Sequence, residues 1–473
     1  MGIPNYSEAD TRVKFIDPQL YDSGWREEHI VREYYFTDGR KLPGGKRGKQ
    51  LYLDYLLTYN NLKVAILEAK RYREDATKGL QQAIDYAVKL GIEYVYASNG
   101  RQIYEFIVSK GKGQYIGQYP NPAELFQNLA PPANNLKSRL LSAPFHTAEG
   151  MRPRYYQERA VNSVMEAIAN RRQRILLTLA TGTGKTYIAF QIVYKLITSK
   201  WNVDGTERRP RILFLADRNI LADQAINTFN PFEKDLLKID GSEIRKRNGR
   251  VPTNAYIFFA IYQAIAEREN IEGYYKEYPS DFFDLVIIDE CHRGSANEEG
   301  SWRDILDHFS GAVHLGLTAT PKRKDNIDTY GYFGNPVYEY SLKEGINDGF
   351  LTPYKVKRIK TNIDEYIYTS ADTIVQGQVE KPFYTIPDFN RDIVIPERAE
   401  LIAKATLQHI RPLDKTIIFC VDQAHALLMR DMINKHKEVR DPFYCVRITS
   451  DEGKVGRELL EKFQDNDKDI PTI

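Results

Sequence analysis

The chain has 473 residues, of which 42% are hydrophobic and 27% charged, and its formal net charge is +2. These values are typical of an ordinary globular protein of about three domains, and they exclude a disordered chain and a uniformly basic nucleic-acid binder. Three cysteines exclude a disulfide framework, and no apolar stretch approaches the ~20 residues of a membrane helix. Because the N-terminus also lacks a signal-peptide pattern, we expect a cytoplasmic protein that does not enter a membrane.

The first region, residues 1–145, is predicted to be an α+β domain that ends at a proline-containing linker, residues 131–144. Within it, two strands are expected at 51–59 and 62–69, joined by a tight Asn-Asn turn.

Three residues on these two strands, Asp54, Glu68 and Lys70, form a candidate nuclease site. Two carboxylates can share Mg²⁺ while an adjacent lysine activates water or stabilises the scissile phosphate. A regular two-residue hairpin pairs position 54 with 67 and turns Asp54 to the wrong face, whereas a longer loop or a β-bulge pairs it with 68. The hypothesis therefore requires such an irregularity. The plainer interpretation is three solvated charges at a sheet edge.

Three further residues are candidates for the same site. Gln82 and Tyr86 lie four residues apart on one face of the next predicted helix, from which both could reach it. Glu8, on an N-terminal helix, could add a metal contact, although capping or solvation explains it as well. Arg71 and Arg73 are candidates for contacts with phosphate.

The second region, residues 150–350, alternates short apolar strands with helices. Near-continuous apolar runs are typical of parallel strands covered on both faces. The strands are expected at 174–179, 211–215, 255–260, 285–288 and 313–317.

A phosphate-binding loop follows the first of these strands, with the sequence Ala-Thr-Gly-Thr-Gly-Lys-Thr at 180–186. In such a loop, glycines let backbone N–H groups surround phosphate oxygens at a helix N-terminus. Lys185 is expected to contact the β- and γ-phosphates of ATP, and the Thr186 hydroxyl to bind Mg²⁺. The residues expected to bind the nucleotide here are Thr181, Gly182, Thr183, Gly184, Lys185 and Thr186.

Two acidic residues, Asp289 and Glu290, follow the fourth strand. Asp289 is expected to bind the metal, and Glu290 to orient or deprotonate the attacking water. Gln157, at the start of a predicted helix, could bond an adenine edge, although a helix-start role is plainer.

The third region, residues 351–473, is predicted to repeat the alternation, with strands at 415–419 and 443–448 and helices at 424–437 and 455–463. Residues 470–473 look like the start of another strand. With the two motifs above, this alternation resembles the second motor domain of superfamily-two helicases, which completes the ATP site with a further strand and an arginine-bearing helix. The resemblance implies an incomplete second motor domain here, in a polypeptide that binds ATP but hydrolyses it slowly on its own.

Residues 150–473 resemble the superfamily-two helicases and translocases. The resemblance implies two RecA-like parallel-sheet domains, with Gln157 reading adenine and His292, Thr318 and Thr320 completing the site. In that family the two threonines link the ATP site to the nucleic-acid track. The N-terminal pattern with Gln82 and Tyr86 similarly resembles a restriction-type nuclease core, so the fold class expected is α/β multidomain.

A nuclease followed by this motor resembles the motor-and-cleavage subunit of type I restriction enzymes. Segments 7–12 and 340–349 are also similar to that family. The resemblance implies ATP-driven translocation along double-stranded DNA, Mg²⁺-dependent cleavage, and separate methylation and specificity subunits as partners. Two alternatives remain open. One is an end-dependent repair helicase–nuclease without a methyltransferase, and the other is an ATP-gated DNA-binding or remodelling protein with an inactive nuclease.

Overall fold

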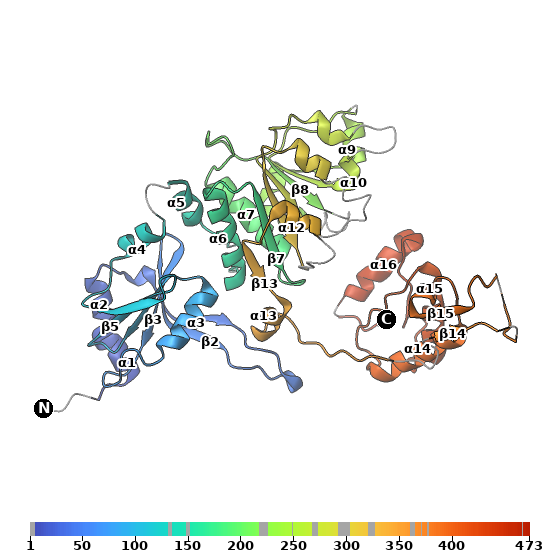
Figure 1. Ribbon diagram of the computed structural model, residues 1–473, viewed down its shortest axis with the longest axis horizontal. Helices are drawn as coiled ribbons and strands as arrows, with labels where there is room; N and C mark the ends of the chain where they lie inside the picture. The colour runs from blue at the N-terminus through green and yellow to red at the C-terminus, as the bar shows by residue number, and fades with distance from the viewer. Residues whose placement is uncertain are drawn as a thin grey trace. The chain divides into compact units, whose positions relative to one another are not determined.

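The computed structural model describes residues 5–473 apart from 131–134, 148–151, 217–225, 248, 267–272, 292–302, 320–326, 360–364, 370, 376–377 and 466. The chain forms two compact units, Met1–Pro353 and Tyr354–Ile473 (Figure 1). Among the described residues, no helix is both long and apolar enough to cross a membrane.

The first sheet lies within residues 5–130, which are described without a gap, and has six strands in the order β1-β2-β3-β4-β5-β6. All neighbours are antiparallel except β3 and β4, which are parallel and are connected by the crossover helix α3 (Leu80–Leu90). The strands are β1 (Ile30–Thr37), β2 (Leu51–Tyr59), β3 (Leu62–Ala69), β4 (Tyr94–Ser98), β5 (Ile103–Ile107) and β6 (Lys112–Ile116).

The β2–β3 hairpin has the strand limits predicted from the sequence, but its pairing is irregular. Thr58 pairs with Lys63 in the register set by the turn, whereas Leu57 pairs with Ala65. Val64 is therefore an extra residue, a β-bulge. Beyond the bulge, the register brings position 54 opposite position 68. The irregularity that the nuclease hypothesis requires is present.

Helices precede the first strand of this sheet in the chain and follow its last strand. The N-terminal helix runs without a break through α1 (Glu8–Thr11), a π-helical segment (Arg12–Ile16) and α2 (Asp17–Asp22). After β6 come α4 (Pro122–Leu129) and α5 (Asn135–Ser142).

The second sheet has seven described strands in the order β13-β7-β12-β11-β8-β10-β9, and all neighbours are parallel. It contains the five strands predicted from apolar runs, and the sequence prediction lacks only the short edge strands β9 and β13. The strands are β7 (Arg174–Leu179), β8 (Ile212–Ala216), β9 (Leu236–Ile239), β10 (Ile257–Ile261), β11 (Leu285–Ile288), β12 (Val313–Thr318) and β13 (Tyr338–Tyr340).

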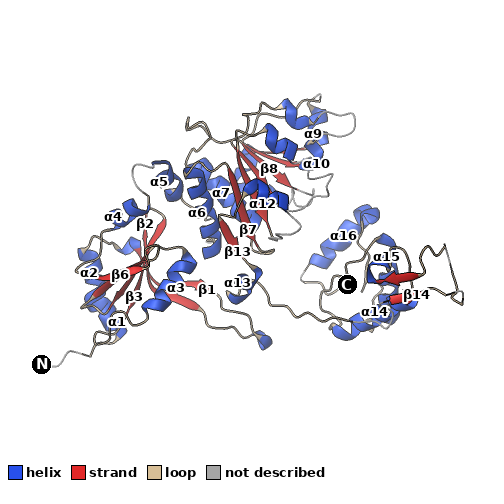
Figure 2. Cartoon of the chain, viewed as in Figure 1, coloured by secondary structure: helices blue, strands red, loops and turns tan. Residues whose placement is uncertain are grey.

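Helices pack around this parallel sheet (Figure 2). They include α6 (Tyr155–Ala169), α7 (Lys185–Thr198), α9 (Gly241–Lys246), α10 (Tyr262–Ile265), α12 (Ile327–Phe333) and α13 (Leu342–Asn347). The sheet is buried on both faces, because Leu177 belongs to one buried cluster while its neighbour Leu176 belongs to another. This burial explains why the strands appear in the sequence as continuous apolar runs.

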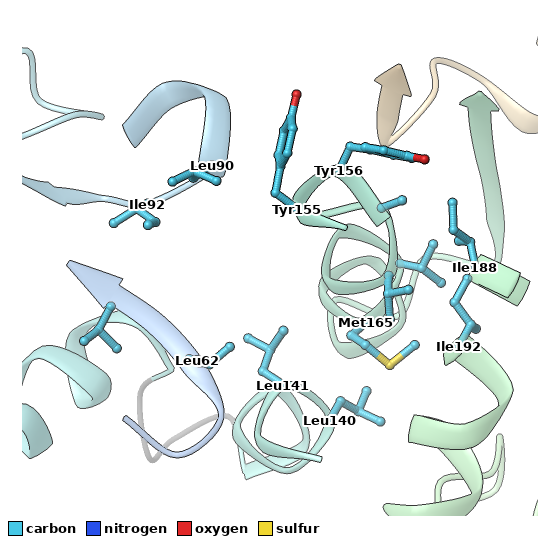
Figure 3. Packing of buried hydrophobic residues seen from close by; sticks show 14 of the residues in the cluster. Leu62, Leu90, Ile92, Leu140, Leu141, Tyr155, Tyr156, Met165, Ile188 and Ile192 are labelled. Atoms are coloured by element: carbon cyan, nitrogen blue, oxygen red, sulfur yellow. The ribbon is translucent and has the colours of Figure 1, made fainter. Parts of the chain in front are cut away.

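The first of these clusters also joins the two sheets. It continues through α7 and α6 into the first sheet, and Figure 3 shows α6 between Ile188 and Ile192 of α7 and residues Leu62 and Leu90 of the first sheet and α3. The two sheets therefore share one hydrophobic core inside the first unit.

The second unit is a smaller body with its own core. Its described elements are β14 (Glu365–Ile367), β15 (Phe383–Thr385), α14 (Pro396–His409), α15 (Gln423–His436) and α16 (Gly453–Gln464). The last two helices match the prediction.

The two strands predicted in this unit, at 415–419 and 443–448, are not formed in the described chain. Both segments instead bond to the backbone of residues 472–473: the Thr416 amide donates to the Thr472 carbonyl (2.8 Å), and the Val446 amide to the Ile473 carbonyl (2.9 Å). These few backbone hydrogen bonds to residues 472–473 are not enough to form the ladder of a β-strand.

Candidate nuclease and nucleotide sites

Asp54 and Glu68 lie on neighbouring strands, in the register created by the Val64 bulge. One Asp54 carboxylate oxygen accepts from the Ala69 amide (2.8 Å), which fixes the side chain beside β3. Lys70 donates to Glu68 Oε1 (2.7 Å) and to the Ala69 carbonyl (2.8 Å). The Glu68 and Lys70 side chains are only 12% and 13% exposed. The three predicted residues are thus brought together in a half-buried cluster.

The charges in this cluster act on one another and on Glu8. Burial raises the pKa of the Glu68 carboxyl, and the Asp54 carboxylate raises it further, while Lys70 lowers it. The pKa of Glu8 is likewise raised, first by burial and then by Asp54. Glu8, the least specific of the candidates in sequence, therefore lies within electrostatic range of the other two carboxylates.

Helix α3 begins directly against this cluster. Gly79, which precedes it, has φ +87, and a Cβ there would lie 2.9 Å from Lys70 Cε and 3.5 Å from Glu68 Oε1. The positive φ favours glycine here, and an added Cβ would displace the end of the Lys70 side chain. Gln82 donates to the Tyr86 hydroxyl (2.8 Å), so the two predicted residues form one bonded pair on α3. Burial raises the pKa of Tyr86, and Glu68 adds to the effect.

Arg12 also contacts the nuclease cluster, a contact that was not predicted from the sequence. Its guanidinium donates to the Asp54 carbonyl (3.3 Å) and to Glu33, and lies 4.9 Å from the centre of the Tyr55 ring. It also lowers the pKa of Glu8, four residues earlier on the same helix. That spacing on one helix face was the available signal.

The carboxylates fit a divalent cation, although the described residues contain no group of three or more His, Cys, Asp or Glu arranged to hold a metal ion. Two like charges, one of which raises the pKa of the other, are a pair that a cation would stabilise. Mg²⁺ commonly uses one or two carboxylates and keeps several waters. Asp54 and Glu68 are therefore the residues that would hold it, with Glu8 nearby.

The second site is the loop between β7 and α7. Gly182 (φ +83) and Gly184 (φ +82) adopt the left-handed conformation that the turn requires, and α7 begins at Lys185. The Thr183 hydroxyl donates to the Ala180 carbonyl (2.6 Å), which closes the loop on itself. Thr181 and Gly182 are exposed, as a phosphate-binding surface requires.

An ion pair joins this loop to the end of β11. Lys185 Nζ lies 3.1 Å from Glu290 Oε1, and the side chains are 10% and 16% exposed. The Glu290 amide donates to the Asp289 carboxylate (3.0 Å), and Glu290 itself has φ 52. The lysine, the two acidic residues and the neighbouring Thr186 are therefore gathered at one edge of the parallel sheet, as the motifs predicted.

Gln157 is hydrogen-bonded to the backbone of the phosphate-binding loop. Its amide accepts from the Arg154 backbone (2.9 Å) and donates to the Thr183 carbonyl (3.0 Å), to which the Tyr156 hydroxyl also donates (2.9 Å). In this state both ends of the Gln157 amide are used inside the protein, and the helix-start interpretation describes its contacts.

Of the three remaining predicted residues, one is described by the structure and two are not. Thr318 is the buried last residue of β12 and pairs with Thr178 of β7. His292 and Thr320 lie outside the described residues.

The chain is similar to known proteins over its whole length. Residues 150–323 match the family model "Type III restriction enzyme, res subunit". The type I restriction enzyme EcoAI endonuclease subunit of Escherichia coli is 39% identical over 100% of this chain and 60% of its own length. A solved structure from Vibrio vulnificus YJ016, a fragment assigned to the HsdR subunit of a type I restriction enzyme, is 39% identical. It covers 100% of this chain and 83% of that one, with a TM-score of 0.79.

The chain belongs to the family of type I restriction enzyme endonuclease subunits. Within this HsdR family, the EcoKI endonuclease subunit of Escherichia coli (strain K12) is 27% identical over 99% of this chain and 47% of its own length. The chain thus spans about half of the curated relatives it matches. Its α/β fold, with a parallel-sheet ATPase-like region, agrees with that of the HsdR fragment.

Proposed function

We propose that this chain supplies the ATP-dependent motor and the Mg²⁺-dependent nuclease of a type I restriction enzyme. The observation that carries the proposal is that the β2–β3 bulge sets a register placing Asp54 beside the end of β3, where the Ala69 amide next to Glu68 donates to its carboxylate, in the same compact unit as the phosphate-binding loop. A solvated sheet edge would not need three half-buried charges held by specific bonds.

The nuclease half of the proposal assigns roles to four side chains. Asp54 and Glu68 hold Mg²⁺, which when bound supplies an activated water and neutralises charge on the scissile phosphate. Lys70, ion-paired to Glu68, contributes its positive charge where the phosphate would develop negative charge during cleavage. Arg12 fixes the Asp54 backbone.

The motor half follows from the ion pair between Lys185 and Glu290. The phosphates of ATP would take Glu290's place beside Lys185, which frees Glu290 to orient a water for hydrolysis. Thr186 and Asp289 would hold the Mg²⁺ that accompanies the nucleotide. Repeated binding and hydrolysis would drive translocation along double-stranded DNA.

Recognition of a DNA sequence would come from partner subunits. The proposed partners are the methylation and specificity subunits that the resemblance to type I restriction enzymes implies; the relatives' names state only that each is the endonuclease subunit of such an enzyme. No zinc module or base-reading helix is evident in the sequence, which supports the division of labour.

The test uses closed circular plasmid with the full-length protein, its partner subunits, Mg²⁺ and ATP. Wild type is compared with Lys185→Ala and Lys70→Ala. We expect both variants to lose cleavage by about a hundredfold or more, because each removes a charge that acts on a phosphate. ATP hydrolysis should survive only in Lys70→Ala.

Cleavage that persists in Lys185→Ala would show that the two activities are merely tethered. Cleavage that persists in Lys70→Ala would remove the nuclease assignment. A wild type that cuts only linear DNA would favour an end-dependent helicase–nuclease instead.

A further inference from the structure

Five consecutive residues at the start of α6, Tyr155–Arg159, contact the phosphate-binding loop on one side and, on the other, α3 and β3, the elements that carry nuclease-site residues. We call these residues the coupling turn. Its members face in different directions around the first helical turn, which allows one short segment to touch the phosphate-binding loop on one side and the nuclease region on the other.

The first side of the coupling turn binds the nucleotide loop. Tyr156 and Gln157 both donate to the carbonyl of Thr183, at 2.9 and 3.0 Å. A Cβ on Gly184 would lie only 2.8 Å from Gln157 Nε2, so loop and turn are in close contact. The loop cannot shift without moving these two side chains or breaking their bonds.

The second side holds the C-terminal end of α3. Arg159 donates to the carbonyls of Val88 (2.9 Å) and Lys89 (2.8 Å), the last turn of that helix. Gly91 allows this contact, because a Cβ there would lie 2.7 Å from Arg159 Nε. Beside it, Glu158 is ion-paired with Lys63 of β3, the strand that carries Glu68.

Asp348, which follows α13, ties the two sides together. Its buried carboxylate accepts from the hydroxyls of Tyr155 and Tyr340 and is ion-paired with Lys89 of α3. Burial and the Asp348 charge both raise the pKa of Tyr155. One carboxylate thus binds the coupling turn and α3 at once.

Helix α3 connects this assembly to the nuclease cluster. Its first residues lie against Lys70 and Glu68 through Gly79, and its last turn is held by Arg159 and Asp348. An eleven-residue helix is a rigid rod of roughly 16 Å, so a displacement at one end reaches the other.

We propose that the coupling turn transmits the nucleotide state of the phosphate-binding loop to the nuclease site through α3, with Arg159 and Asp348 as positioning residues. The proposal rests on the proposed function. The trigger is the exchange of Glu290 for ATP phosphates beside Lys185, which alters the loop to which Tyr156 and Gln157 are bonded. Gln82 and Tyr86 then move with α3.

The test measures amide hydrogen exchange in the full-length protein, with and without a non-hydrolysable ATP analogue and Mg²⁺. In the wild type we expect nucleotide to change exchange in α3 by about fivefold or more, the lower end of typical couplings between sites. In Arg159→Gln, protection of α7 by nucleotide should remain while the response of α3 disappears. Asp348→Asn should behave in the same way.

The matched control is Glu166→Gln, two turns further along α6, where a half-exposed carboxylate pairs with Lys137 and touches neither site. In Glu166→Gln, nucleotide should still change amide hydrogen exchange in α3. If Asp348→Asn does not fold, Lys89→Met removes the same ion pair from its more exposed partner. In the complex with partner subunits, Arg159→Gln should hydrolyse ATP normally but cut less DNA per ATP.

The proposal would be overturned if nucleotide left hydrogen exchange in the wild-type α3 unchanged. It would also be overturned if nucleotide still changed hydrogen exchange in α3 in both Arg159→Gln and Lys89→Met. Lower thermal stability with an intact α3 response would indicate a merely structural contact and would also overturn it. Failure of the proposed function is recognised separately, because it would appear as a wild type without plasmid cleavage, whereas the exchange measurement needs no DNA.

Discussion

Lys195, in the helix that follows the phosphate-binding loop, has a fully buried side chain. Its ammonium group donates to the Leu141 carbonyl (3.0 Å) and lies 4.2 Å from the centre of the Phe145 ring. Burial lowers the pKa of Lys195 to about 7, an effect that Glu158 partly offsets. A lysine that holds the segment between the two sheets therefore changes charge near neutral pH.

The stability of the protein should depend on pH through this residue. The folded-state pKa lies below the value of 10.5 for an unperturbed lysine. Between about pH 7 and 10 the unfolded chain binds more protons, so stability rises with pH, while below pH 7 both states are protonated and the contribution is constant. We predict that the free energy of unfolding, relative to Lys195→Met, rises by up to about 1.4 kcal/mol per pH unit in that window.

Urea denaturation followed by tryptophan fluorescence measures this difference, because all three tryptophans lie in the first unit. A difference between the two proteins that stays constant from pH 6 to 10 would contradict the lowered pKa.

Single residues also mark the limit of what the sequence predicted about the sites. Lys185 belongs to one motif and Asp289 and Glu290 to another; each motif follows a parallel strand, so both were expected at the same sheet edge, and the structure gathers them there. The contacts of Arg159 and Asp348 were invisible, because they join segments roughly 70 and 260 residues apart in the chain. No local pattern reports a pairing at that separation.

At the scale of elements, the end of α3 depends on Gly91. This residue has φ +70, and a Cβ would collide with Arg159 Nε at 2.7 Å. We predict that Gly91→Ala costs the backbone strain of a left-handed alanine, on the order of 1 kcal/mol or more, and in addition weakens the two bonds from Arg159 to the end of α3. The second loss should be roughly 1.5–3 kcal/mol, as is typical of hydrogen bonds to charged groups.

Gly111→Ala is the control for the strain alone. Gly111 has φ +59 and nothing within 4 Å of the added Cβ. Urea denaturation of the two variants separates the effects, since only Gly91→Ala should show the larger loss of stability and the altered α3 response to nucleotide. Equal losses in both variants would mean that Arg159 moves aside without cost.

The elements themselves were predictable where the pattern was strong. The β2–β3 hairpin has the predicted limits because its turn consists of two asparagines, both with positive φ. The bulge could not be located, since Val64 is one of four consecutive apolar residues, 64–67, with nothing to distinguish it. The prediction of strands at 415–419 and 443–448 was wrong. An apolar run forms a strand only when another segment of sufficient length pairs with its backbone.

At the scale of the whole molecule, the sequence predicts three domains and the structure describes two compact units. Most of the linker predicted at residues 131–144 is helix α5, and α7 holds it: Lys195 donates to the Leu141 carbonyl (3.0 Å), and just beyond the predicted linker Gln191 bonds to both the amide and the carbonyl of His146 (2.9 Å each). A segment that looks like a flexible connection in sequence is therefore bound to the helix of the phosphate-binding loop. This contact joins the first sheet to the second in addition to their shared core.

This organisation predicts how the protein unfolds. One buried cluster runs from Ile16 to Tyr340 through both large sheets, whereas the second unit has a much smaller cluster of its own. Calorimetry of the full chain should therefore show two transitions, because the sheets of the first unit cannot separate without exposing their common core. Arg159→Gln should lower the midpoint of the larger transition by roughly 2–5 °C without splitting it. A third transition, or a first sheet that melts while the second stays folded, would mean that the shared core is too weak to couple the two sheets, and would weaken the case for a rigid connection through α3.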